Sequence, residues 1–159
     1  MEIYKNFARR PTQKMEIYGL DSETTKFTIF PLFFNNFDEQ EDLVTESISQ
    51  LRNEGFKDSD IVLLSNFHEG CIARKLLEKK EWKNRISEFD INNKDKILYT
   101  TIGRFKGLEA PAIIITDFTS IENKQNLFYV GISRALHRLS VFLHRDMKDN
   151  INEIVTNKI

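Results

Sequence analysis

The chain has 159 residues, of which 40% are hydrophobic and 30% charged, and its formal net charge is −1. A chain of this length is typical of one domain that buries roughly 70% of its unfolded surface. The balanced charge excludes a globally basic surface, so any nucleic-acid binding must come from a local patch. The single cysteine, Cys71, excludes an intramolecular disulfide, and no run of about 18 apolar residues predicts a membrane span. We therefore expect a cytoplasmic protein.

Apolar strands alternate with amphipathic helices through the first two thirds of the chain. The predicted elements are a strand at Phe27–Phe34, a helix at Asp38–Glu54, a strand at Asp60–Ser65 and a helix at about Gly70–Lys80. Pro31 lacks a backbone donor, which favours an edge position or an irregular strand. The charged, Asn-rich residues 81–95 predict a connecting loop with one short strand at Ile86–Phe89. We expect Trp82 to cover the core, with surface stacking as the alternative.

This alternation predicts βαβ units, hence an α/β fold with a mostly parallel sheet and helices on both faces. In such sheets, ligands bind at the carboxyl ends of the strands. Asn66 and His68 follow the strand at Asp60–Ser65. They are interpreted first as turn residues and second as groups that a ligand can reach.

Most of the functional information lies between Tyr99 and Arg145. A buried strand at Ile97–Thr101 leads into a polar turn with two glycines, and we expect its hydroxyls, lysine, glycine and glutamate to lie where that strand ends. Phe128–Ala135 predicts a helix whose last turn carries Ser133 and Arg134, just before an apolar strand. A fixed arginine beside a sheet suits phosphate, because its guanidinium stays charged and offers a planar fork of donors. Asp146–Thr156 predicts a last amphipathic helix.

These two segments resemble a known family. Thr101–Glu109 resembles motif V of superfamily 1 helicases of the UvrD/Rep type, and Tyr129–Ala135 resembles their motif VI. The resemblance is close over residues 97–145 and loose elsewhere. It implies that residues 1–159 form one RecA-like domain, the C-terminal half of a motor and a fragment of a longer chain. A phosphate-binding glycine loop followed by Lys-Ser or Lys-Thr is absent, as is an acidic pair after a strand, with Asp117 a lone acid.

The resemblance implies a nucleotide site shared with another domain. Arg134 would act as an arginine finger on ATP, while Glu109 would bind the ribose and Gly107 would let the backbone approach. Asn6–Thr12 weakly resembles motif IV, with Ala8 at the family's arginine position, so Arg9 and Arg10 are candidate nucleotide contacts. ATP and Mg²⁺ would be held by the complete motor, whose N-terminal RecA-like domain carries the Walker A and B motifs. We expect this chain alone to be inactive and to hold no metal.

The resemblance also implies a track for single-stranded DNA. Thr100 and Thr101 would bind phosphates, with Arg104 and Lys106 adding positive charge. The family usually has a strand-contacting histidine where this chain has Gly103, and Glu and Arg residues where it has Asn123-Lys124-Gln125-Asn126. These departures favour an alternative, a non-catalytic helicase-like module that binds nucleic acid or a protein partner. A flavodoxin-like domain is a third interpretation, although the sequence shows no cofactor loop for it.

Overall fold

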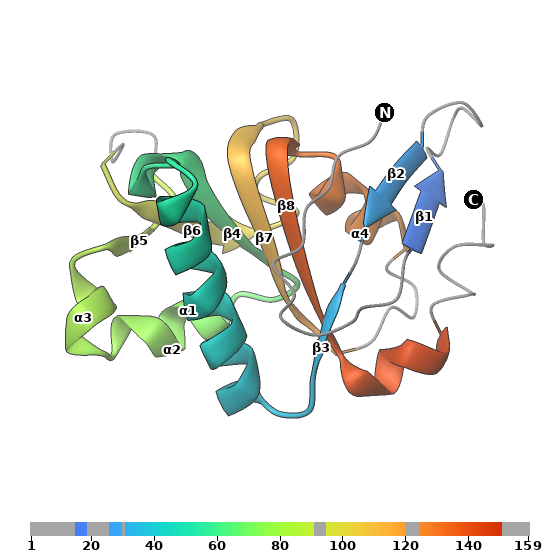
Figure 1. The fold of residues 1–159 in the computed structure, drawn as a ribbon, viewed down its shortest axis with the longest axis horizontal. Coiled ribbons are helices and arrows are strands. Elements are labelled where there is room, and N and C mark those ends of the chain that lie inside the picture. The colour runs from blue at the N-terminus through green and yellow to red at the C-terminus, as the bar shows by residue number, and fades with distance from the viewer. Residues whose placement is uncertain (1–14, 19–25, 30, 91–94, 120–124, 151–159) are drawn as a thin grey trace.

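The computed structural model describes residues 15–18, 26–29, 31–90, 95–119 and 125–150 (Figure 1). The strands are β1 (Met15–Tyr18), β2 (Lys26–Ile29), β3 (Leu32–Phe34), β4 (Ile61–Ser65), β5 (Ile86–Glu88), β6 (Ile97–Thr101), β7 (Ala110–Phe118) and β8 (Ala135–His144). The helices are α1 (Phe37–Asn53), α2 (Ile72–Leu77), α3 (Lys80–Lys83) and α4 (Gln125–Ile132), with 3-10 turns η1 (Asp58–Asp60) and η2 (Arg145–Asn150).

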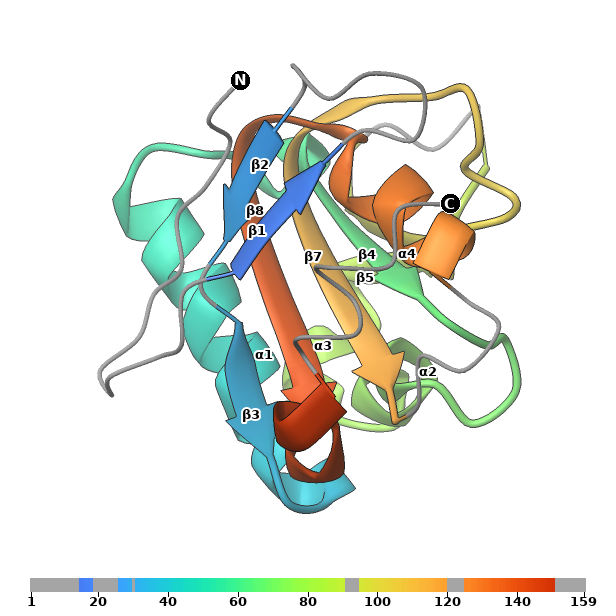
Figure 2. The ribbon, with the colours of Figure 1, turned by 90° about the vertical axis from the view of Figure 1, so that its right-hand side faces the viewer.

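Six parallel strands form the central sheet, in the order β3-β8-β7-β4-β6-β5, and β1 pairs antiparallel with β2 in a separate ribbon. Helices α1 and α2 cover one face, and α4 covers the other, as the two views show (Figures 1 and 2). Leu63 of β4 faces α1 and α2, whereas its neighbours Val62 and Leu64 face α4. Burial on both faces explains the continuous apolar runs. The predicted α/β fold is therefore confirmed.

The predicted first strand is divided at Pro31. Residues before it form β2, and residues after it form β3, which pairs within the central sheet only with β8 and is therefore an edge strand. This agrees with the expected effect of a residue that cannot donate to the ladder. The helix predicted at Asp38–Glu54 and the short strand predicted at Ile86–Phe89 are present, within a residue at their ends.

Two predicted helices differ from the structure. The helix expected at Gly70–Lys80 ends as α2 at Leu77, because Lys79 has an extended backbone and starts the separate turn α3. The helix expected at Asp146–Thr156 begins as the 3-10 turn η2 instead, and its second half lies outside the described residues. Trp82, at 7% exposed, covers the core as predicted, and Cys71 is buried.

Connections leave the carboxyl ends of neighbouring strands toward opposite faces. From β4 the chain passes to α2, whereas from β6 it enters a turn whose Ile102 and Phe105 pack on the α4 face. Such a divergence opens a crevice at the carboxyl edge of a parallel sheet, which is the usual place for a ligand. The topology therefore marks the ends of β4 and β6.

Asp117, near the carboxyl end of β7, is fully buried and joins four elements. Ser65 Oγ of β4 and Thr116 Oγ1 each lie 2.7 Å from its Oδ2, and the backbone N–H of Ile72 in α2 reaches both oxygens at 3.1 and 3.2 Å. Gln40 of α1 donates from its amide to Oδ1 and accepts from the Asp117 N–H at 2.7 Å. The residue has a φ of 67°, in the left-handed region.

Burial raises the pKa of Asp117 above its ordinary value, although its hydrogen bonds oppose this change. The contacts accommodate a proton. Ser65 Oγ lies 2.6 Å from the Phe67 carbonyl, which can only accept, so the single Ser65 proton is used there and Asp117 can donate to Ser65. The carboxyl group is thus suited to its neutral form.

We expect Asp117→Asn to retain most of the stability and Asp117→Ala to lose about 2–4 kcal/mol. The asparagine amide can replace the protonated oxygen, since it donates to Ser65 and Asn tolerates the left-handed backbone. Alanine leaves the buried Ile72 N–H and Gln40 amide unpaired. Urea denaturation measures both variants, with Asp42→Asn on the exposed side of α1 as the control. Equal losses for Asn and Ala would contradict the neutral carboxyl.

The same group predicts a pH dependence of the unfolding free energy. Because the folded pKa is raised, the stabilisation by the neutral form is complete below the unfolded pKa and is lost as pH rises through the folded pKa. Asp117→Asn removes this contribution. The difference in stability between wild type and Asp117→Asn should therefore shift in favour of the variant as pH rises above about 4.

Candidate functional site at two edges of the sheet

The motif residues lie at opposite edges of the sheet. Thr101 is at the carboxyl edge, because it and Thr116 both pair with Ser65 of β4. Ala110 begins β7 and pairs with Ala135, the first residue of β8. Six residues of β7 separate these levels, or about 20 Å at the rise of a strand. Residues 102–109 therefore cross the α4 face from one edge to the other.

This crossing corrects one expectation from the sequence. The hydroxyls of Thr100 and Thr101 do lie where β6 ends, but Glu109 immediately precedes β7 at the opposite, amino edge. The motif is continuous in sequence and divided in space. Its beginning and its end therefore face different surroundings.

Arg134 occupies the amino edge, directly after α4. Its Nε donates to the Val130 carbonyl at 3.2 Å, its Nη2 to Ser133 Oγ at 3.1 Å and its Nη1 to the Leu108 carbonyl at 3.5 Å. The Ala110 N–H donates to the Arg134 carbonyl at 3.1 Å, so the crossing segment and the end of α4 are tied together. Partial exposure and three internal bonds leave a fixed guanidinium that an anion can approach.

The other predicted nucleotide contacts surround this arginine in part. Glu109 is exposed and lies between Leu108 and Ala110, which both bond to Arg134. Gly107 has a φ of 85°, so the crossing segment turns there in a conformation that favours glycine. Arg9 and Arg10 lie outside the described residues.

The predicted nucleic-acid contacts lie at the start of the crossing. Thr100 is 3% exposed, whereas Thr101 is half-buried and its Oγ1 accepts the Arg104 N–H at 3.3 Å. The Arg104 side chain is 67% exposed, with Nη1 3.6 Å from Glu88. Lys106 is exposed. One hydroxyl and two cations are therefore available on this surface, while Thr100 belongs to the strand interior.

Sequence reasoning missed two groups. Asp117 was interpreted only as a lone acid, and Glu88 was not singled out, although it lies 2.8 Å from His68 as well as near Arg104. The first had a signal in its sequence, a single acid ending a run of isoleucines. The second had none, because its partners come from other elements.

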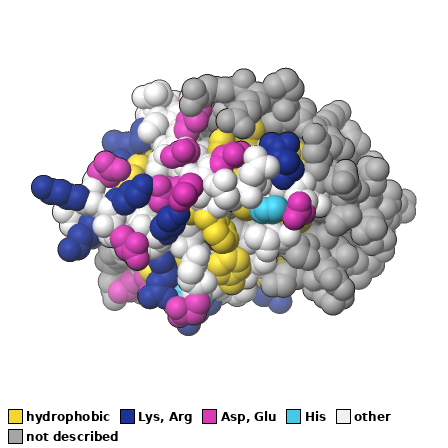
Figure 3. All heavy atoms as spheres, turned by 90° about the horizontal axis from the view of Figure 1, so that it is seen from below, with side chains coloured by type: hydrophobic (Ala, Val, Ile, Leu, Met, Phe, Trp, Pro, Cys, Tyr) yellow, Lys and Arg dark blue, Asp and Glu magenta, His cyan; other side chains and the backbone are white. Residues whose placement is uncertain are grey.

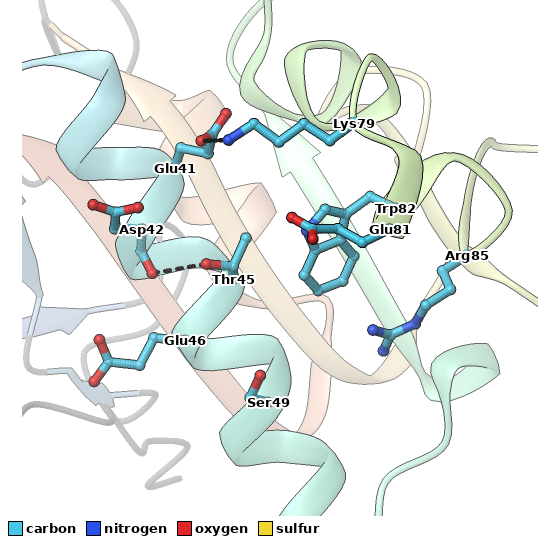
Figure 4. A pocket seen from close by; sticks show the side chains of 9 residues that line it. All are labelled: Glu41, Asp42, Thr45, Glu46, Ser49, Lys79, Glu81, Trp82 and Arg85. Carbon is cyan, nitrogen blue, oxygen red and sulfur yellow. Dashed lines mark hydrogen bonds and ion pairs between the residues drawn. The ribbon is translucent and has the colours of Figure 1, made fainter.

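The larger clefts lie away from Arg134. One of about 640 Å³ separates α1 from α3, where Lys79 bonds to Glu41 and the Arg85 guanidinium lies 4.6 Å from the centre of the Trp82 ring (Figure 4). Another of about 380 Å³ lies at the carboxyl ends of β3 and β8, lined by Phe34, Phe37 and His144 among others. Figure 3, from below, shows hydrophobic side chains gathered beside a histidine. Neither cleft includes a motif residue.

In the part of the chain that the structure describes, no three His, Cys, Asp or Glu side chains are grouped as metal ligands. None of the described helices is long and apolar enough to cross a membrane.

Comparison with known families identifies the central segment. Residues 96–142 match the UvrD-like helicase C-terminal domain. This UvrD-like segment contains both motif resemblances, which it confirms. A search of curated proteins finds no match to the chain.

A solved structure shares the fold. The C-terminal domain of a possible DNA helicase from Lactobacillus plantarum WCFS1 superposes with a TM-score of 0.57, at 18% identity, over 70% of this chain and 71% of that one. The UvrD-like segment therefore lies within a fold that is also found in that domain.

Gly131, within the UvrD-like segment, allows α4 to approach the crossing segment. A Cβ at this position would lie 2.8 Å from Ile102 Cδ1 and 3.0 Å from Ile115 Cδ1. All three residues are buried. A glycine is therefore required here by packing rather than by its backbone angles.

We expect Gly131→Ala to destabilise the domain by about 1–3 kcal/mol through overpacking. Ile102→Val deletes the Cδ1 atom that the new methyl group meets, so the double variant should recover most of the loss. Denaturant midpoints of the two single variants and the double variant measure this coupling. Simple additivity of the two losses would show that Gly131 matters for another reason.

Proposed function

We propose that this chain is the C-terminal motor domain of an ATP-dependent superfamily 1 DNA helicase. The observation that carries the proposal is the division of the UvrD-like segment between two edges of one sheet. Arg134 and Glu109 lie at the amino edge, and Thr101 and Arg104 lie at the carboxyl edge. A single domain can thus contact two different phosphate ligands at once.

At the amino edge, Arg134 is the arginine finger of a nucleotide site. The triphosphate is held mainly by an N-terminal RecA-like domain with Walker A and B motifs, which also supplies the ligands of Mg²⁺. The fixed guanidinium fits an anion at this surface. Glu109 accepts hydrogen bonds from the ribose hydroxyls, Gly107 lets the backbone approach, and Arg9 and Arg10 add charge. Together these residues complete an ATP site that this chain alone lacks.

At the carboxyl edge, Thr101, Arg104 and Lys106 contact the phosphates of single-stranded DNA, next to the buried Thr100. The crossing segment connects this contact with Arg134. Ile102 and Phe105 are 0% and 2% exposed, so the segment is anchored in the core and can transmit a displacement between the edges.

A non-catalytic module remains a second candidate because of Gly103. The residue is exposed, and a Cβ there would meet no atom within 4 Å. Packing therefore does not require glycine, and the lack of a side chain affects only the surface that would face a strand. This favours weaker strand contacts than those of a complete motor. ATP turnover by the native protein separates the two functions.

We expect Arg134→Ala to reduce kcat for ATP by about 10³–10⁵ in the complete native motor, the range for an arginine finger. Arg134→Lys should restore little, because lysine lacks the planar fork. Thermal unfolding and nucleotide binding serve as controls for folding. Turnover within about threefold of wild type would exclude the role of Arg134. Background turnover by the wild-type native protein would favour the non-catalytic module.

We expect the paired change Arg104→Ala and Lys106→Ala to weaken binding of single-stranded DNA and to reduce the salt slope by about 1.4, or 0.7 for each contact. Fluorescence anisotropy at several salt concentrations measures both values. Lys83→Ala with Lys80→Ala, on α3, removes the same charge elsewhere and is the matched control. Unchanged binding at low salt would exclude this track.

A further inference from the structure

Glu88, at the carboxyl end of the edge strand β5, lies among basic side chains from three other elements. Its Oε1 is 2.8 Å from His68 Nε2 and 3.6 Å from Arg104 Nη1. Arg74 Nη1 lies 3.5 Å from the other ring nitrogen of His68. His68 first, and then Arg104 and Arg74, hold the pKa of Glu88 below its ordinary value. The carboxylate is thus the anion at the centre of a cationic cluster.

The cluster lies at the edge where the topology places a ligand crevice. His68 follows β4, Arg104 follows β6, and Arg74 belongs to α2, which leaves β4 on the opposite face from the crossing segment. Convergence of basic groups at this divergence is the arrangement expected for an anion site. Here the anion is supplied by the chain itself.

We propose that His68, Arg74 and Arg104 form a phosphate subsite and that Glu88 occupies it until a phosphodiester group of single-stranded nucleic acid displaces the carboxylate. The proposal rests on the proposed function, which assigns Arg104 to the nucleic-acid track. Carboxylate and phosphate oxygens accept the same bonds from guanidinium and imidazole groups. Nothing in the sequence motifs assigns His68, Arg74 or Glu88 to this track.

The exposure of the cluster makes displacement feasible. The Glu88 side chain is 48% exposed, and those of His68 and Arg104 are 34% and 67% exposed. Ion pairs at such sites contribute little net free energy, so a strand with several phosphates can replace one of them. Arg74 also has Glu69 at 3.3 Å, on the outer side of the cluster. Glu88 therefore restrains binding without blocking it.

The test is Glu88→Gln in the complete native protein, with a fluorescent oligothymidylate as the probe. Removing the competing carboxylate should tighten binding about three- to fivefold at low salt, the range set by one exposed ion pair. Glu81→Gln on α3 gives the same change of net charge beside a different cleft and should leave affinity unchanged (Figure 4). Adding Arg74→Gln to Glu88→Gln should remove the gain, and thermal unfolding checks that each variant folds.

Unchanged affinity in Glu88→Gln, or an equal gain in Glu81→Gln, would overturn the subsite. If Arg104→Ala with Lys106→Ala still weakens binding in that case, the track stands and only the subsite is wrong. Titration of Glu88→Gln with inorganic phosphate, followed by the NMR signals of the His68 ring, distinguishes the source of the phosphate. Perturbation by the ion but not by the oligonucleotide would overturn the assignment to nucleic acid.

Discussion

The buried Asp117 carboxyl is the interaction on which the arrangement of the carboxyl edge depends. It is bonded to β4, α1 and α2 as well as to its own strand, so each of these elements has one permitted position relative to the others. An apolar group there would fill the space but would not select a register. The bond to Ser65 is especially consequential, because His68 lies three residues later and takes its position from the same turn.

The second constraint is the crossing segment between β6 and β7. In eight residues the chain leaves the carboxyl edge, packs Ile102 and Phe105 against α4 and reaches the amino edge at Glu109. A typical helix would carry the chain across but would place side chains all round its axis. The compact turn instead buries one side and exposes Arg104 and Lys106 on the other. The close approach at Gly131 is what allows α4 to cover such a short connection.

The sequence predicts the layers of this fold because burial leaves a local signal. Runs such as Ile113–Ile115 predict strands buried on both faces, and Pro31 correctly indicates an edge. The polar contacts leave no such signal, since Asp117 meets partners 45 to 77 residues away and Glu88 meets His68 across 20 residues. The motif resemblance locates the site residues, but continuity in sequence conceals that Thr101 and Glu109 lie at opposite edges.

The two edges differ in how their arginines are neutralised. Among the described residues, Arg134 is bonded to two carbonyl oxygens and a hydroxyl, which orient the guanidinium but do not cancel its charge. Arg104 is instead opposed by the carboxylate of Glu88. An uncompensated charge attracts any anion that reaches it, whereas a paired charge favours a ligand with several phosphates that can replace the partner. The amino edge is therefore suited to one fixed, highly charged group and the carboxyl edge to an extended polyanion.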